Sequence, residues 1–158
     1  MADNIAVRGV DDFKAKLLEL PRAMRRRVLR NALAAGARLV RDEAKRNAPV
    51  LSAAYIKAPY RKPGTVRGAI RVRTSKQATR AGDVGVFVNV KPAKGSNRGG
   101  KNPNDPFYWR FLEFGTRRMS ARPFLQKGGD KLQQALGVFE SALGKWIAKV
   151  NDSGRVQP

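Results

Sequence analysis

The sequence predicts a small α+β fold, in which an antiparallel sheet packs against a long basic helix and a C-terminal amphipathic helix. Residues 21–45 carry apolar side chains at helical spacing, and so do residues 132–150. Between them, four valines at positions 84, 86, 88 and 90 alternate with other residues, which is typical of a strand. At 158 residues, the chain is expected to form a single domain over residues 1–150, followed by a polar tail over residues 151–158.

Two short elements are expected before the long helix. Residues 5–10 alternate weakly and are rich in β-branched side chains, which predicts a strand. Asp11 or Asp12 then caps a helix whose apolar face consists of Phe13, Leu17 and Leu20. Pro21 ends that helix and can open the next one.

The long helix is expected to bury one face and to expose a cationic one. The buried face consists of Met24, Val28, Ala32, Ala35 and Leu39, widened by Leu29, Leu33, Val40 and Ala44. The cationic face consists of Arg22, Arg26, Arg30, Arg38, Arg41 and Lys45. A helix with so wide an apolar arc is expected to pack on a sheet or on another subunit.

A hairpin and a long loop are predicted in the middle of the chain. Residues 50–64 contain two prolines and are expected to form an irregular loop or hairpin. Strands over residues 69–74 and 84–90 are expected to pair antiparallel through the link at residues 75–82. Residues 91–105 form a polar loop rich in glycine and lysine, and a loop of this length is either functional or disordered.

The stretch from residue 107 to 125 holds half of the chain's aromatic residues. Asp105 is expected to cap a short helix that has Pro106 in its first position. Phe107, Phe111 and Phe114 recur at helical spacing and are expected to be core, and Gly115 is expected to end the helix with a positive φ. The C-terminal helix that follows is expected to be capped by Asp130 and to bury Leu132, Leu136, Phe139, Leu143, Trp146 and Val150.

Glu113 lies inside this aromatic stretch and close to several arginines. A partly buried carboxylate needs a partner, so a salt bridge to Arg122 is expected. The other neighbouring acidic residues, Asp11 with Asp12 and Asp42 with Glu43, are interpreted as caps or helix-surface pairs.

The charge balance is strongly basic, with 33 Lys and Arg against 12 Asp and Glu, a net charge of +21 and a pI near 11.5. Such a chain is attracted to polyanions, whether nucleic acid, acidic protein or anionic lipid. The absence of cysteine excludes disulfides and thiolate metal sites. The sequence shows neither an apolar run of membrane-spanning length nor a signal peptide, which predicts an intracellular protein when it is made.

No catalytic, cofactor-binding or metal-binding residue is predicted. The chain has no histidine and no cysteine, which are the usual general base and strong nucleophile. Residues 95–102 match the phosphate-binding loop except at the last position, where Asn102 replaces the Mg²⁺-binding hydroxyl. Pro103 also prevents the required helix from starting there, so nucleotide binding is rejected.

Two motifs carry a resemblance to a known family. Glu113-Phe114-Gly115-Thr116 is followed, after five residues, by Arg122-Pro123-Phe124-Leu125. This order resembles the signature of the tail-completion, head–tail joining or neck proteins of long-tailed DNA bacteriophages, the gene-product-ten-like family of lambdoid phages. Residues 9–13, 44–49 and the valine strand are also similar to that family. Family members commonly show a Thr-Gly-basic-Leu segment after Ala-Pro. In this chain the nearest match lies at residues 64–67, beyond an insertion at about residues 51–63.

The resemblance implies a non-enzymatic virion structural protein that forms a ring, of six copies in the family, in the phage neck. Such a ring completes the tail and joins it to the head, after assembly in the host cytoplasm. The implied partners are further copies of the chain, the adjoining head-completion or connector ring, the tail-tube protein and DNA in the channel. The family motif comprises Phe111, Glu113, Phe114, Gly115, Thr116, Arg122, Pro123 and Phe124.

Eight residues are candidate contacts to another subunit or ring: Arg117, Arg118, Met119, Lys94, Arg98, Lys101, Arg26 and Arg30. The alternative function is a basic nucleic-acid-binding protein. Against it, the cations are spread over helix, strands and loops and do not form a recognised reading module. An enzyme is the third class, and no residue pattern supports it.

Overall fold

The computed structural model describes residues 14, 15, 17–52 and 62–152. The strand expected at residues 5–10, the cap at Asp11 or Asp12, Phe13 and the last six residues of the tail lie outside the described residues. So does much of the segment expected to be irregular, at residues 53–61.

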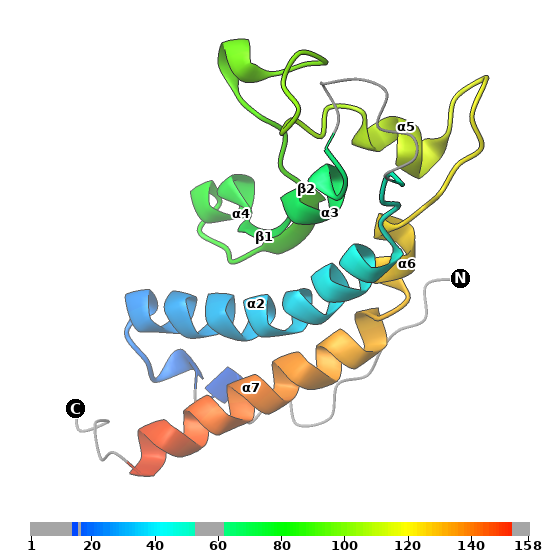
Figure 1. Ribbon diagram of the computed structural model, residues 1–158. Coiled ribbons are helices and arrows are strands. Elements are labelled where there is room, and N and C mark those ends of the chain that lie inside the picture. The colour runs from blue at the N-terminus through cyan, green and yellow to red at the C-terminus, as the bar shows by residue number, and fades with distance from the viewer. Residues whose placement is uncertain (1–13, 16, 53–61, 153–158) are drawn as a thin grey trace.

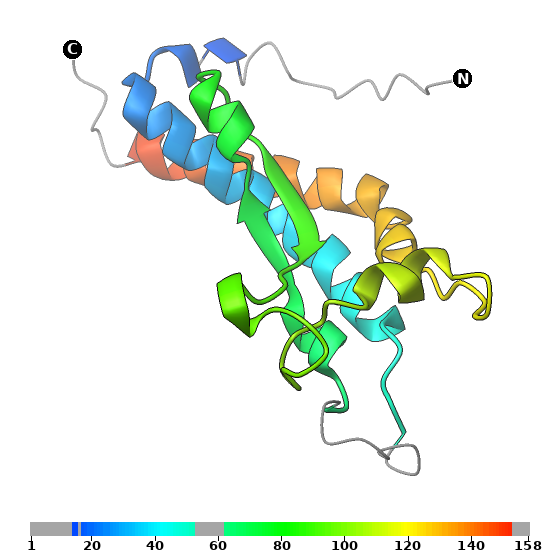
Figure 2. The ribbon, with the colours of Figure 1, turned by 90° about the horizontal axis from the view of Figure 1, so that it is seen from above.

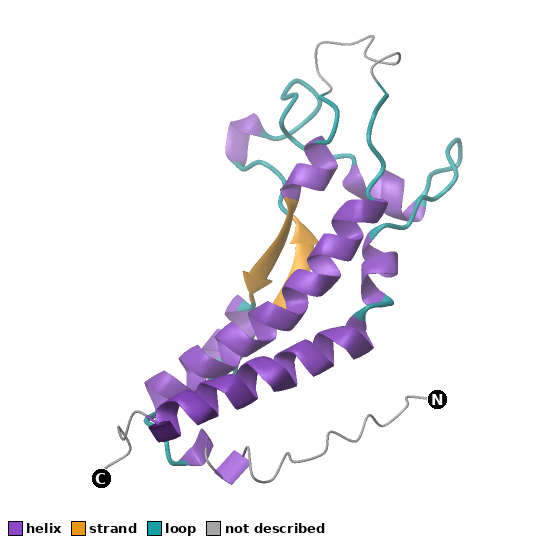
Figure 3. Ribbon diagram, turned by 60° about the horizontal axis from the view of Figure 1, so that its bottom comes forward, coloured by secondary structure: helices purple, strands orange, loops and turns teal. Residues whose placement is uncertain are grey.

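Two long antiparallel helices form the body of the molecule, α2 (Arg22–Asn47) and α7 (Leu132–Asp152). They lie side by side, and the sheet covers another side of α2 (Figures 1 and 3). Pro21 immediately precedes α2, as predicted, and its φ of −53° suits a helix start. At the other end, Ala48 is extended, with a ψ of 124°, because it precedes Pro49.

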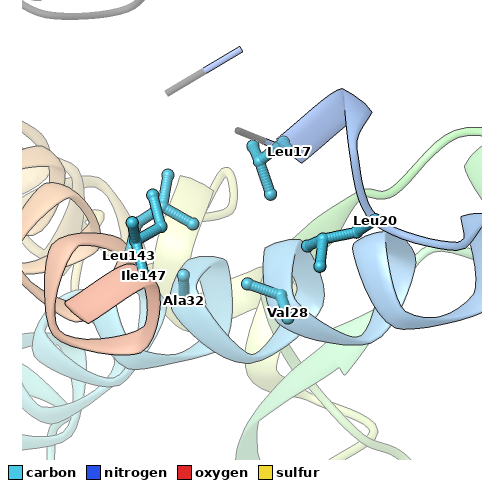
Figure 4. Packing of buried hydrophobic residues seen from close by; sticks show 6 residues of the cluster. All are labelled: Leu17, Leu20, Val28, Ala32, Leu143 and Ile147. Carbon is cyan, nitrogen blue, oxygen red and sulfur yellow. The ribbon is translucent and has the colours of Figure 1, made fainter. Parts of the chain in front are cut away.

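A cluster of apolar side chains joins the two helices to the segment before Pro21 (Figure 4). Leu17 and Leu20 pack there against residues from the first half of α2 and the second half of α7, which are Val28, Ala32, Leu143 and Ile147. The helical spacing predicted all six of these residues except Ile147. It was wrong for Met24, which is 48% exposed, and for Leu132, which is 60% exposed. Both lie in the first turn of a helix, and periodicity does not reveal how far along a helix its partner reaches.

The predicted hairpin is confirmed, with β1 (Ile70–Thr74) paired antiparallel to β2 (Val86–Val90). Its register aligns Ile70 with Val90 and Thr74 with Val86. The link between the strands is a short helix, α4 (Lys76–Arg80), where only a connection was expected. The Oγ of Ser75 caps this helix by accepting from the amide of Ala78 at 3.2 Å.

A second apolar cluster holds the sheet on the last turns of α2. It comprises Ala44, Ala48, Val66, Ile70, Val90 and Phe124, and Tyr108, Trp109 and Leu112 pack against it. Val66 belongs to α3 (Thr65–Ala69), a helix that no pattern in the sequence predicts. Phe124, from the second of the two family motifs, has no exposed surface and lies at the centre of this cluster.

The remaining elements are η2 (Gly95–Asn97), α5 (Trp109–Phe114) and α6 (Leu125–Gly129). The helix α6 was not predicted, and Asp130, which was expected to cap the C-terminal helix, ends α6 instead. The loops gather at the end of the molecule where α2 finishes and α7 begins (Figures 2 and 3). Among the described helices, none is long and apolar enough to cross a membrane.

Candidate assembly surface at the loop end

The site is organised by Glu113, whose carboxylate is 6% exposed. Its two oxygens accept three backbone hydrogen bonds, from Phe124 at 2.8 Å and from Leu125 and Gln126 at 2.9 Å. These are the free amides at the start of α6, so Glu113 caps that helix from the preceding one. The expected salt bridge to Arg122 is therefore wrong, because backbone amides already satisfy the carboxylate.

Between the two helices, residues 115–121 form a projecting hairpin (Figure 1). Thr116 and Met119 exchange backbone hydrogen bonds of 2.8 and 3.2 Å, which leaves Arg117 and Arg118 at the tip. At the base, the amide of Arg122 donates to the carbonyl of Leu112 at 2.7 Å. Together with Glu113, this bond fixes both ends of the hairpin to the body of the protein.

Gly115 begins the hairpin with a φ of +75°, which confirms the predicted positive φ. A Cβ at this position would lie 2.8 Å from the amide nitrogen of Ala121 and 2.9 Å from the carbonyl oxygen of Met119. Both the dihedral angle and the space therefore require glycine, and a side chain costs on the order of 1 kcal/mol from the dihedral angle alone.

The aromatic side chains of α5 divide between the core and the surface. The expectation that Phe111 and Phe114 are core is wrong, since they are 52% and 76% exposed. Phe107, at 37% exposed, is also largely at the surface. The face of α5 that packs against the second apolar cluster instead carries Trp109 and Leu112, with Tyr108 just before the helix, so Phe111 and Phe114 face outward.

A pocket of about 500 Å³ lies beside these exposed residues. Its walls come from the segment after α2, the start of α3, α5 and the hairpin, and include Val50, Leu51, Val66, Phe111, Leu112 and Met119. Val50 and Met119 are also substantially exposed, at 50% and 38%. The loop end thus presents an apolar edge, which consists of Phe111, Phe114 and Met119. Next to it lies a cationic tip, which consists of Arg117 and Arg118.

Asp105 organises the neighbouring loop over residues 91–105. It was expected to cap the aromatic helix, but its side chain is 1% exposed and accepts from the amides of Ala93 at 2.9 Å and Gly99 at 2.6 Å. The carboxylate therefore holds two points of the long loop against the body. Lys94, Arg98 and Lys101 are exposed on this loop.

The eight candidate contact residues fall into separate groups. Six of them belong to the hairpin and the long loop, at the loop end. Arg26 and Arg30 instead lie in the first half of α2, toward the other end of the molecule (Figure 1).

The motifs with possible chemistry have structural roles in the described residues. Asp42 pairs with Arg41 at 2.8 Å, and this hydrogen bond lowers the pKa of Asp42 and raises that of Arg41. Glu43 pairs with Arg46 at 2.7 Å on the surface of α2. No helix begins after Lys101, so the phosphate-loop geometry is absent from residues 95–105. The described part of the chain contains no cluster of three or more potential metal ligands.

Comparison with protein families gives a match to a family of phage proteins. The profile of the HK97-gp10-like family, described as "Bacteriophage HK97-gp10, putative tail-component", covers residues 11–115, about two-thirds of the chain. It includes Asp105, Glu113 and Gly115. No curated protein and no solved structure gave a significant match. The chain therefore belongs to the HK97-gp10-like family of bacteriophage tail components.

Proposed function

We propose that this tail component is a non-enzymatic subunit of a ring in the phage neck, which completes the tail and joins it to the head. The observation that carries the proposal is the projecting hairpin, which is fixed at its base by Glu113 and Leu112 yet has its tip in solvent. A projection with exposed Met119 and two arginines, next to the exposed Phe114 at the end of α5, is suited to contact with another chain.

The apolar edge and the cationic tip have different partners in this proposal. Copies of one chain in a ring contact each other head to tail, so the surfaces that meet are different. Phe111, Phe114 and Met119 contact the neighbouring copy, because apolar contact is not opposed by the shared positive charge. Arg117 and Arg118 dock on an acidic face of the adjoining connector ring or tail tube, since opposite charge orients the encounter.

The contact with the neighbouring copy is tested by Phe114→Ser. Because Phe114 is 76% exposed, the variant should fold like the parent chain but lose ring formation, measured by sedimentation velocity. Val138→Ser, at a 38%-exposed position of α7, is the matched control and should still form rings. Rings that form normally with Phe114→Ser contradict the assignment of this edge.

Docking on the adjoining ring is tested by the double reversal Arg117→Glu and Arg118→Glu. Both residues are exposed, so the protein should fold and form rings but fail to join tails to heads. Lys145→Glu with Lys149→Glu changes the net charge equally on the exposed side of α7 and should leave joining intact. Infectious tailed particles at normal yield from the hairpin variant would refute the docking role.

A further inference from the structure

A second cationic surface lies on α2, remote from the projecting hairpin at residues 115–121. Arg26, Arg27, Arg30, Arg38 and Arg41 project within about a third of the helix circumference, and we call them the arginine face. From Arg26 to Arg41 this face extends about 22 Å along the helix axis. Arg27, Arg30 and Arg38 are exposed.

The charge of the arginine face is almost uncompensated. Within the described part of the chain, only Arg41 of these five residues forms an ion pair, with Asp42. Arg26 donates to the carbonyl oxygen of Thr79 at 3.1 Å, which fixes its guanidinium beside α4 without neutralising it.

The first part of the face borders a groove of about 340 Å³ between α2 and the end of β1 with the link, including α4, that follows it. Arg26, Arg27 and Arg30 line one side of it, and Thr74, Thr79 and Asp83 line the other. The groove thus combines three guanidinium groups with two threonines. Asp83 is its one acidic side chain, and it has no ion pair among the described residues.

The composition of the arginine face distinguishes between two kinds of polyanionic partner, nucleic acid and acidic protein. Helical geometry places only arginine, lysine and alanine residues of α2 on this face. The centre of a protein interface is typically depleted of lysine and acidic residues and combines arginine with aromatic residues and methionine, as at the loop end. A cationic surface without an aromatic anchor instead suits a phosphate backbone, which arginine binds through paired N–H groups.

From these observations the geometry points to a second binding activity: the arginine face binds the phosphate backbone of duplex DNA without sequence preference. Contacts to phosphates fix the position of a protein on DNA and carry no sequence information. This inference is independent of the ring contacts proposed for the loop end.

The test is the binding of the full-length protein to a fluorescent duplex of arbitrary sequence, followed by anisotropy over a range of salt concentrations. Arg27→Glu with Arg30→Glu should weaken binding at least about tenfold near 0.1 M salt and reduce the slope of log K against log salt by about 2. Neither side chain makes a hydrogen bond or ion pair among the described residues, so the fold should be retained.

Two further variants make the test specific. Lys145→Glu with Lys149→Glu lowers the net charge equally on the neighbouring helix and should weaken binding less than about threefold, because only non-local attraction is lost. Asp83→Asn should strengthen binding, since it removes the one carboxylate of the groove. Thermal unfolding of the Asp83 variant should match that of the parent chain, so that the gain is assigned to the removed carboxylate.

Three results would overturn the inference. The first is an equal loss of affinity in the two double variants, which would mean that the charge acts diffusely. The second is unchanged affinity in the Arg27 and Arg30 variant. The third is tighter binding of a polyglutamate of matched charge than of the duplex, which would assign the face to an acidic protein. Ring formation by the Arg27 and Arg30 variant should be normal, so failure here is distinguishable from failure of the proposed ring.

Discussion

At the scale of single residues, Glu113 has the largest structural consequence. Its carboxylate is buried yet has no cationic partner in the described part of the chain, and three amides at the start of α6 take that place. An acidic residue in this position links α5 to α6 and closes the base of the hairpin. This explains physically why the Glu-Phe-Gly-Thr and Arg-Pro-Phe-Leu motifs occur together, since the first supplies the acceptor and the second supplies the donors.

Replacing Glu113 with Gln should lower the free energy of unfolding by about 2–3 kcal/mol, because hydrogen bonds to a charged acceptor are lost and the new amide group faces amide donors. Chemical denaturation measures this change. Glu19→Gln, at an exposed position, is the control and should change stability by less than about 0.5 kcal/mol. Equal stability of the two variants would mean that the three hydrogen bonds contribute nothing to folding.

At the scale of elements, Gly36 determines how closely α2 and α7 approach. It is buried in α2, and a Cβ there would collide with the backbone carbonyl of Ala135 in α7. The helices are therefore in backbone contact at this point, and the apolar clusters lie on either side of it. Periodicity could not identify this residue, because glycine carries no apolar side chain to count.

Gly36→Ala should destabilise the protein by about 1–3 kcal/mol, although alanine is the better helix former, because the helices must move apart. Gly144→Ala in α7 is the matched control. No atom lies within 4 Å of its added Cβ, so this variant should gain up to about 1 kcal/mol from helix propensity. The thermal midpoints should therefore shift in opposite directions, and a shift in the same direction would contradict the close contact.

At the scale of the whole molecule, a net charge of +21 opposes the association of like copies. Salt screens this repulsion, with a Debye length of about 10 Å at 0.1 M. The apolar edge at the loop end is insensitive to screening, whereas phosphate binding by the arginine face is weakened by it. The two proposed interactions should therefore respond to salt with opposite signs.

Raising the salt concentration from low to moderate should thus strengthen ring formation and weaken DNA binding. Sedimentation velocity measures the first effect, and anisotropy with a duplex measures the second. Ring formation that decreased with salt would show that ionic contacts dominate between copies, and it would assign Arg117 and Arg118 to the neighbouring subunit.

The sequence by itself determined the features that depend on neighbouring residues. Helical spacing and Pro21 gave the start of α2, alternation gave the two strands, and the need for a positive φ identified Gly115. The arginine face is also local, because helix geometry alone places its residues together. The order of the two motifs around the hairpin indicated the phage family, and the family match supports that interpretation.

Only the tertiary structure decided the features that depend on partners distant in the sequence. The helices α3, α4 and α6 have five residues each, too short to be stable without packing or caps supplied from elsewhere. The partners of Glu113 and Asp105 are backbone amides, which every residue except proline carries, so no sequence pattern marks them. Phe111 and Phe114 face outward, because the side chains that α5 buries depend on how the whole chain packs around Phe124.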